Sequence, residues 1–95
     1  MSLKDRIASK QAHVAVVGLG YVGLPLAVRI AEVGLRTYGI DINGPRVARI
    51  NDGISDIGDV DSADLAPLVS AGLLSAHTDF SVIAQADAVI ICVPT

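Results

Sequence analysis

Residues 13–41 restrict the possible fold more than any other part of the chain. They begin with a short apolar run, HVAVVG, which is too short for a helix and is typical of a buried strand. A glycine pattern follows, Gly18-x-Gly20-x-x-Gly23, then a longer apolar segment and a second short run that ends in Asp41. Three glycines alone are weak evidence, because glycine is common in turns. A strand, a glycine turn, a helix and a second strand ending in an acid together indicate a dinucleotide-binding fingerprint.

Each glycine of this pattern has its own physical role. Gly18 permits a tight turn at the end of the strand, Gly20 lets a pyrophosphate approach the backbone, and Gly23 allows the helix to pack closely on the sheet. The N-terminus of the helix offers unpaired N–H groups and partial positive charge to the phosphates. Asp41, at the tip of the second strand, would accept hydrogen bonds from the hydroxyl groups of the adenosine ribose.

The acid at the end of the second strand also favours NAD over NADP. A carboxylate at Asp41 would repel the 2′-phosphate of NADP, and Arg46 is the only nearby positive charge that could weaken this repulsion. Position alone leaves two roles open for Arg46: a solvated surface side chain, or a group that covers the adenosine end of the ligand.

The rest of the chain predicts short alternating elements. Residues 1–12 are a polar lead-in, either loose or with a short helix from Leu3. The expected elements after the first strand are a helix from about 21–23 to 33, a strand at 37–41, a helix from Pro45, a helix at 65–71, a strand within 73–78, one helical turn capped by Asp79 or Ser81, and a strand at 88–93.

Three local features carry more specific expectations. Residues 53–64, rich in Asp and Gly, predict a solvated loop, because the glycine and glutamate positions of an EF-hand do not fit. Asp64 would cap the following helix and place Pro67 in its first turn. The continuous apolar run at 88–93 predicts a strand covered on both faces, with Cys92 as a buried core residue rather than a nucleophile. His13 has no neighbouring ligand residues, so we expect no metal there.

Length and composition exclude several classes of protein. The 95 residues allow one small domain, and the net charge of −3 comes without a basic cluster, so neither nucleic acid nor an anionic membrane is an expected partner. Apolar stretches are interrupted well before about 18 residues, and the N-terminus lacks the apolar segment of a signal peptide. The single cysteine cannot form an internal disulfide, which fits a cytoplasmic location.

Four stretches together resemble a known family. They are GLGYVGLPLA at 18–27, GIDIN at 39–43, Arg46, and ADAVIICVPT at 86–95. The chain is similar to the N-terminal NAD-binding segment of the UDP-glucose/GDP-mannose dehydrogenase family, the nucleotide-sugar 6-dehydrogenases, from about His13 to Thr95. Family members often carry a proline after the serine of the loop that reads Ser55-Asp56 here. This departure favours the N-acetylmannosamine type over the UDP-glucose type.

The resemblance implies a cofactor site and a reaction. NAD would bind to residues from the glycine turn and from the ends of two later strands: Gly18, Leu19, Gly20, Tyr21, Val22, Gly23, Asp41, Arg46, Val93, Pro94 and Thr95. The family oxidises the C6 alcohol of a UDP-sugar to a carboxylate in two NAD-dependent steps, through a thioester on a cysteine. That cysteine, its lysine partner and the sugar-binding domain lie downstream in the family, so this chain would be inactive alone. Cys92 does not correspond to the catalytic cysteine.

We therefore expect an α/β fold, a partial Rossmann-like doubly wound parallel sheet of about four strands in the order 3-2-1-4. Residues 13–95 would be the N-terminal part of an NAD-binding domain, truncated before the substrate domain, because a finished domain rarely stops just after a buried strand. An apolar strand at the edge of the sheet favours a homo-oligomer. The alternatives are another Rossmann dehydrogenase, of the β-hydroxy acid type, and a freestanding nucleotide-binding module.

Overall fold

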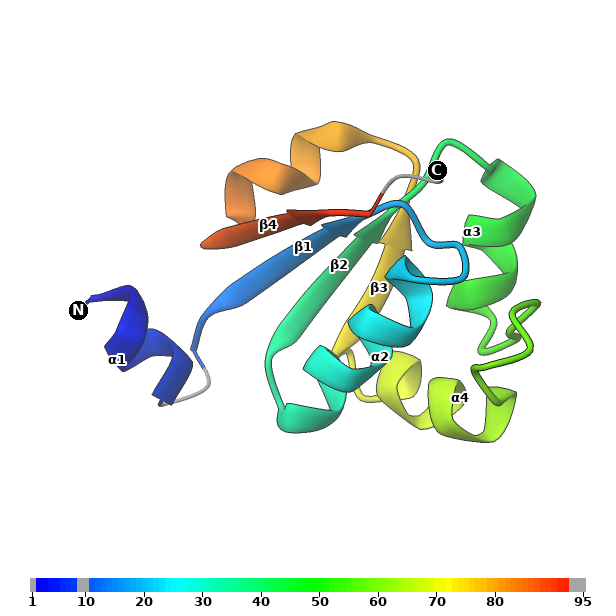
Figure 1. Cartoon of the computed structure of the whole chain (residues 1–95), viewed down its shortest axis with the longest axis horizontal. Coiled ribbons are helices and arrows are strands. Elements are labelled where there is room, and N and C mark those ends of the chain that lie inside the picture. The colour runs from blue at the N-terminus through cyan, green and yellow to red at the C-terminus, as the bar shows by residue number, and fades with distance from the viewer. Residues whose placement is uncertain (1, 9–10, 93–95) are drawn as a thin grey trace.

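Four parallel strands form the centre of the molecule (Figure 1). The computed structural model describes residues 2–8 and 11–92. The strands are β1 (His13–Val17), β2 (Arg36–Ile40), β3 (Leu74–His77) and β4 (Ala88–Ile91), in the order β3-β2-β1-β4. The predicted order 3-2-1-4 is confirmed. Because all strands are parallel, their carboxyl ends meet at one edge of the sheet, where the glycine turn and the β2–α3 connection also lie.

Helices cover the sheet from two sides (Figure 1). On one side lie α2 (Gly23–Val33), α3 (Gly44–Asn51) and α4 (Ser62–Ser70); on the other lies the 3-10 helix η1 (Phe80–Gln85). A further helix, α1 (Leu3–Ala8), precedes β1 and corresponds to the helical alternative for the lead-in. Short polar side chains cap α3 and η1: Asn43 accepts a hydrogen bond from the amide of Arg46, and Asp79 accepts one from Ser81.

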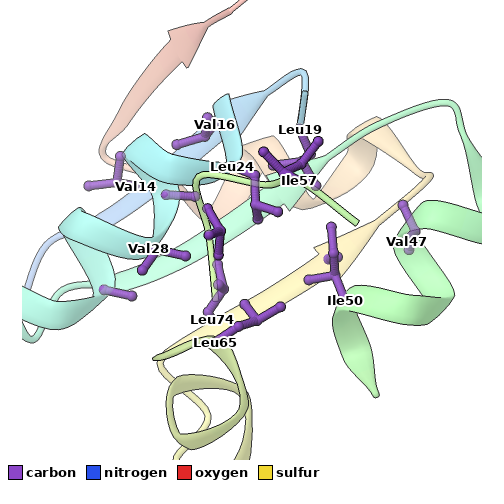
Figure 2. Close-up of a cluster of buried hydrophobic side chains, with 14 of the residues drawn as sticks. Val14, Val16, Leu19, Leu24, Val28, Val47, Ile50, Ile57, Leu65 and Leu74 are labelled. Atoms are coloured by element: carbon purple, nitrogen blue, oxygen red, sulfur yellow. The ribbon is translucent and has the colours of Figure 1, made fainter. Parts of the chain in front are cut away.

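The main core lies between the sheet and the three helices (Figure 2). Alternate residues of β1 face it, because successive side chains of a strand point to opposite faces. The largest fully buried side chains of this core come from the glycine turn, all three helices and β3: Leu19, Leu24, Ile50, Leu65 and Leu74. The opposite face of the sheet carries a smaller cluster, Ala15, Tyr38, Ile40 and Val82, which η1 covers.

The prediction that both faces of the last strand are covered was wrong. Ile90 packs against the main core, whereas Val89 and Ile91 on the other face are 43% and 67% exposed. The reason is the placement of η1, which packs mainly on β1 and β2, so that these two side chains of β4 are only partly covered. Cys92 is half-buried against the main core.

The start of α4 was also predicted wrongly. The helix begins at Ser62, one turn before Leu65, and its cap is Asp61, which accepts a hydrogen bond from the amide of Ala63. Pro67 therefore lies beyond the first turn, inside the helix. The loop before α4 is less solvated than expected, because Ile57 and Val60 are buried in the main core.

Candidate cofactor site

The turn between β1 and α2 is packed so closely that a side chain at either of two of its glycines would collide with the backbone. Gly18 has a φ of +95°, a conformation that other residues rarely adopt, and its amide donates to the carbonyl of Ile40 at 2.7 Å. A Cβ at Gly18 would overlap the carbonyl of Cys92, and one at Gly23 would overlap the carbonyl of Gly18. The turn is thus held against the ends of β2 and β4 by backbone contacts.

Gly20, the second glycine of the pattern, faces open space. No atom of the described chain lies within 4 Å of a Cβ placed on Gly20. The next two residues, Tyr21 and Val22, are 79% and 69% exposed. The amides of residues 20–23 have no hydrogen-bond acceptor in the described part of the chain. A group larger than water can therefore approach this backbone from outside.

The N-terminus of α2 favours a negatively charged group at this place. Val22 at the N-cap offers no side-chain hydrogen bond, and the first turn of the helix contains no acidic residue. The unpaired amides and the helix dipole place partial positive charge there. A pyrophosphate fits this combination of open backbone and positive dipole.

Leu19 turns inward from the same segment. Its side chain is buried over Gly39, where any side chain on β2 would collide with it. Its amide donates to Oδ2 of Asp41 at 2.8 Å. Leu19 therefore connects the turn to the core and to the acid, while the residues after it remain open.

Asp41 lies directly after β2, beside the glycine turn. Its second carboxylate oxygen, Oδ1, accepts a hydrogen bond from the amide of Asn43 at 2.9 Å, and its own amide donates to the carbonyl of His77. Each oxygen of a carboxylate can accept two hydrogen bonds, so both retain capacity for a ligand. The half-buried Asp41 carboxylate can therefore hold a pair of hydroxyl groups next to the phosphate position.

Arg46 lies on the first turn of α3, and its side chain is paired with the loop that follows the helix. Its Nε lies 3.2 Å from Oδ2 of Asp56, and Nη2 of Arg49 lies 2.9 Å from the same oxygen. Partial burial alone would raise the pKa of Asp56. The hydrogen bonds and positive charges of Arg49 and Arg46 outweigh this effect and hold the pKa below its ordinary value of 3.8. Sequence reasoning missed Asp56 as a partner of these arginines. The signal for it was two arginines one helical turn apart, which favour a carboxylate nearby.

Three predicted cofactor contacts, Val93, Pro94 and Thr95, lie outside the described residues. Cys92, the last described residue, lies beside the glycine turn, where its amide donates to the carbonyl of Val17 at 2.7 Å. His13 contacts Tyr38, with 2.8 Å between the imidazole Nδ1 and the phenol oxygen. Residues 2–8 and 11–92 contain no group of three His, Cys, Asp or Glu side chains that could hold a metal, and no helix among them is long and apolar enough to cross a membrane.

A match to a family model decides which family this chain belongs to. The model of the UDP-glucose/GDP-mannose dehydrogenase family, NAD binding domain, matches residues 12–95. The chain belongs to this family. The match is to the NAD-binding domain of the family, and the cofactor is NAD. Membership of this family excludes one alternative from the sequence, a Rossmann dehydrogenase of the β-hydroxy acid type.

Individual relatives agree with this family. A UDP-N-acetyl-D-mannosamine dehydrogenase of Methanococcus maripaludis is 40% identical over 83 residues, covering 86% of this chain and 19% of the relative. A UDP-N-acetyl-D-glucosamine 6-dehydrogenase of Pseudomonas aeruginosa is 42% identical over 87 residues, covering 90% and 19%. The chain thus spans about a fifth of the length of these curated relatives.

Solved structures of the family share the fold. The ternary complex of GDP-mannose dehydrogenase from Pseudomonas aeruginosa has a TM-score of 0.80 and 34% identity, covering 86% of this chain and 19% of that one. A UDP-D-ManNAc dehydrogenase from Pyrococcus horikoshii has a TM-score of 0.79 and 34% identity, covering 85% and 20%. The Rossmann-like fold predicted from the sequence is confirmed by these similarities.

Proposed function

We propose that this chain supplies the NAD site of a nucleotide-sugar 6-dehydrogenase. The whole enzyme would oxidise the C6 alcohol of a UDP-sugar to a carboxylate in two NAD-dependent steps. Membership of the family and the names of the relatives support this proposal. When bound, NAD supplies the hydride acceptor, while the protein supplies binding and orientation.

The observation that carries the proposal is the open turn of residues 20–23 beside the Asp41 carboxylate. The amides of Gly20, Tyr21, Val22 and Gly23 would bind the pyrophosphate, with Gly18 and Leu19 shaping the turn. Asp41 would hold the adenosine ribose and Arg46 would lie on the adenosine side. The residues after β4, Val93, Pro94 and Thr95, would line the rest of the cofactor.

The chemical step would depend on residues that this sequence does not contain. Its only cysteine is Cys92, which packs against the core behind the glycine turn. We therefore propose that residues 13–95 are the first part of the NAD-binding domain of a longer cytoplasmic enzyme, and that the 95-residue chain does not oxidise sugars. The substrate would be a UDP-sugar of the N-acetylmannosamine type, consumed in polysaccharide biosynthesis, and the enzyme would be a homo-oligomer.

Calorimetric titration of the chain with NAD and with NADP tests the cofactor site. We expect NAD to bind more tightly than NADP. Asp41→Asn should weaken NAD binding by about 10-fold or more, because a hydrogen bond to a charged group contributes about 1.5–3 kcal/mol. Asp52→Asn is the matched control, since Asp52 caps the far end of α3 and its substitution should leave the affinity unchanged.

Circular dichroism of both variants separates a binding defect from unfolding. NADP binding that equals or exceeds NAD binding would contradict the assignment of Asp41. A structure of the complex with the phosphates away from residues 20–23 would contradict the proposal as a whole.

A further inference from the structure

Two arginines of α3 share a single carboxylate. Nε of Arg46 and Nη2 of Arg49 both approach Oδ2 of Asp56, at 3.2 Å and 2.9 Å. The side chains of Arg46 and Asp56 are each only 26% exposed, so this pair is partly shielded from solvent. Nε of Arg49 is buried without a partner among the described residues. Asp56 is thus the acceptor on which both guanidinium groups depend.

This cluster is connected to the acid at the cofactor site through the start of α3. The amide of Arg46 donates to Oδ1 of Asn43 at 3.1 Å, and the amide of Asn43 donates to Oδ1 of Asp41 at 2.9 Å. Arg46 is therefore anchored to the loop that holds Asp41. Of the two arginines, Arg46 is the one on the first turn of the helix, next to the predicted ribose position.

The charges of the cluster and the cofactor site balance. Arg46 and Arg49 contribute two positive charges, and Asp41 and Asp56 contribute two negative charges. A 2′-phosphate would add about −1.5 to −2 charges at the ribose. While Asp41 and Asp56 together compensate the two arginines, that added charge meets no surplus positive charge. Without Asp56, the same surface would carry one unpaired positive charge beside Asp41.

We propose that Asp56 is a positioning residue that determines cofactor specificity: it holds Arg46 in an ion pair and so withholds its charge from a 2′-phosphate. This inference rests on the proposed function, because it requires Asp41 to hold the ribose. Asp41 discriminates against NADP by direct repulsion, whereas Asp56 acts through Arg46. The Asp- and Gly-rich loop before α4 thus contributes to selectivity without contacting the cofactor.

The test compares NAD and NADP dissociation constants for the wild-type chain and Asp56→Asn. We expect the variant to bind NADP about 3-fold to 5-fold better relative to NAD, the size of an exposed ion-pair effect. The shift should shrink at high salt, because screening weakens exposed charges. In the double variant Arg46→Gln with Asp56→Asn the shift should disappear. Asp56→Glu, which retains the charge, should behave as the wild type.

Asp59→Asn is the matched control. Asp59 lies in the same loop, and its carboxylate has no ion pair with the part of the chain that the structure describes. A general effect of loop charge or loop stability would appear in this variant too, and would overturn the role assigned to Asp56.

The outcomes separate the two proposals. A wild-type chain that binds neither dinucleotide would remove the proposed function and this inference with it. A wild-type chain that prefers NAD, with an unchanged ratio of NADP to NAD affinity in Asp56→Asn, would overturn the inference alone. A shift that persists after Arg46→Gln would also overturn it, because the effect would then not pass through Arg46.

Discussion

Gly18 and Gly20 belong to one sequence pattern, yet the structure gives them different physical roles. Gly18 has a positive φ and a backbone neighbour in the place of a Cβ, so it serves the fold. Gly20 has free space around it, so it serves a ligand. The two roles can be separated by the same substitution at each position.

Gly18→Ala should lower the free energy of unfolding by about 3 kcal/mol or more, the range of severe backbone strain and collision. Gly20→Ala should change it by less than about 1 kcal/mol and should weaken NAD binding about 10-fold, because the methyl group occupies the open approach to the backbone. Urea unfolding and calorimetry measure the two effects. Equal loss of stability in both variants would contradict this division of roles.

The ion pairs of Asp56 predict a dependence of stability on pH. Because the pKa of Asp56 in the folded chain lies below 3.8, its contribution is fully present above that pH and is lost as the pH falls through the folded value. The difference in free energy of unfolding between wild type and Asp56→Asn should be constant from about pH 7 to 5 and should shrink towards about pH 3. Urea unfolding across this range measures it. A difference that grows in acid would contradict the assigned sign.

At the level of secondary structure, Pro67 is the main local conflict. It lies inside α4 and has no N–H to donate to the preceding turn. The residue is exposed, so its replacement removes no core contact.

Pro67→Ala should raise the free energy of unfolding by about 2–2.5 kcal/mol. A proline inside a helix costs about 3 kcal/mol, and its restriction of the unfolded chain offsets about 0.4–1 kcal/mol of that cost. Pro45→Ala is the control, because Pro45 lies in the first turn of α3, where its amide would have no helical acceptor. Thermal unfolding measures both variants. A loss of stability in Pro67→Ala would show that the proline supports α4.

For the whole molecule, β4 places exposed apolar side chains at the edge of the sheet. Val89 and Ile91 face outward there, and no described strand pairs with the outer edge of β4. Apolar edge strands favour pairing with another chain. We propose that this surface makes the isolated chain self-associate.

Ile91→Lys should shift the chain towards monomer at concentrations where the wild type associates, because a lysine at an edge strand opposes pairing. Val33→Lys is the control, since Val33 is 58% exposed at the end of α2, away from β4. Sedimentation at several concentrations measures the association. A wild-type chain that stays monomeric at high concentration would contradict the proposal.

The sequence by itself determined the parts of this protein that depend on local chemistry. Short apolar runs predicted the strands, the glycine pattern predicted the turn, and Pro45 marked the start of a helix. Parallel strands joined by helices then left few possible orders for the sheet, and 3-2-1-4 was among them. The placement of Asp41 beside the turn followed from the same order.

Only the tertiary structure decided which distant groups meet. The pairing of Asp56 with Arg46 depends on how the loop folds back on α3, and the burial of Ile57 and Val60 depends on the same packing. The exposure of Val89 and Ile91 depends on where η1 lies. Local propensity carries no information on such contacts, because their energies arise between segments that are far apart along the chain.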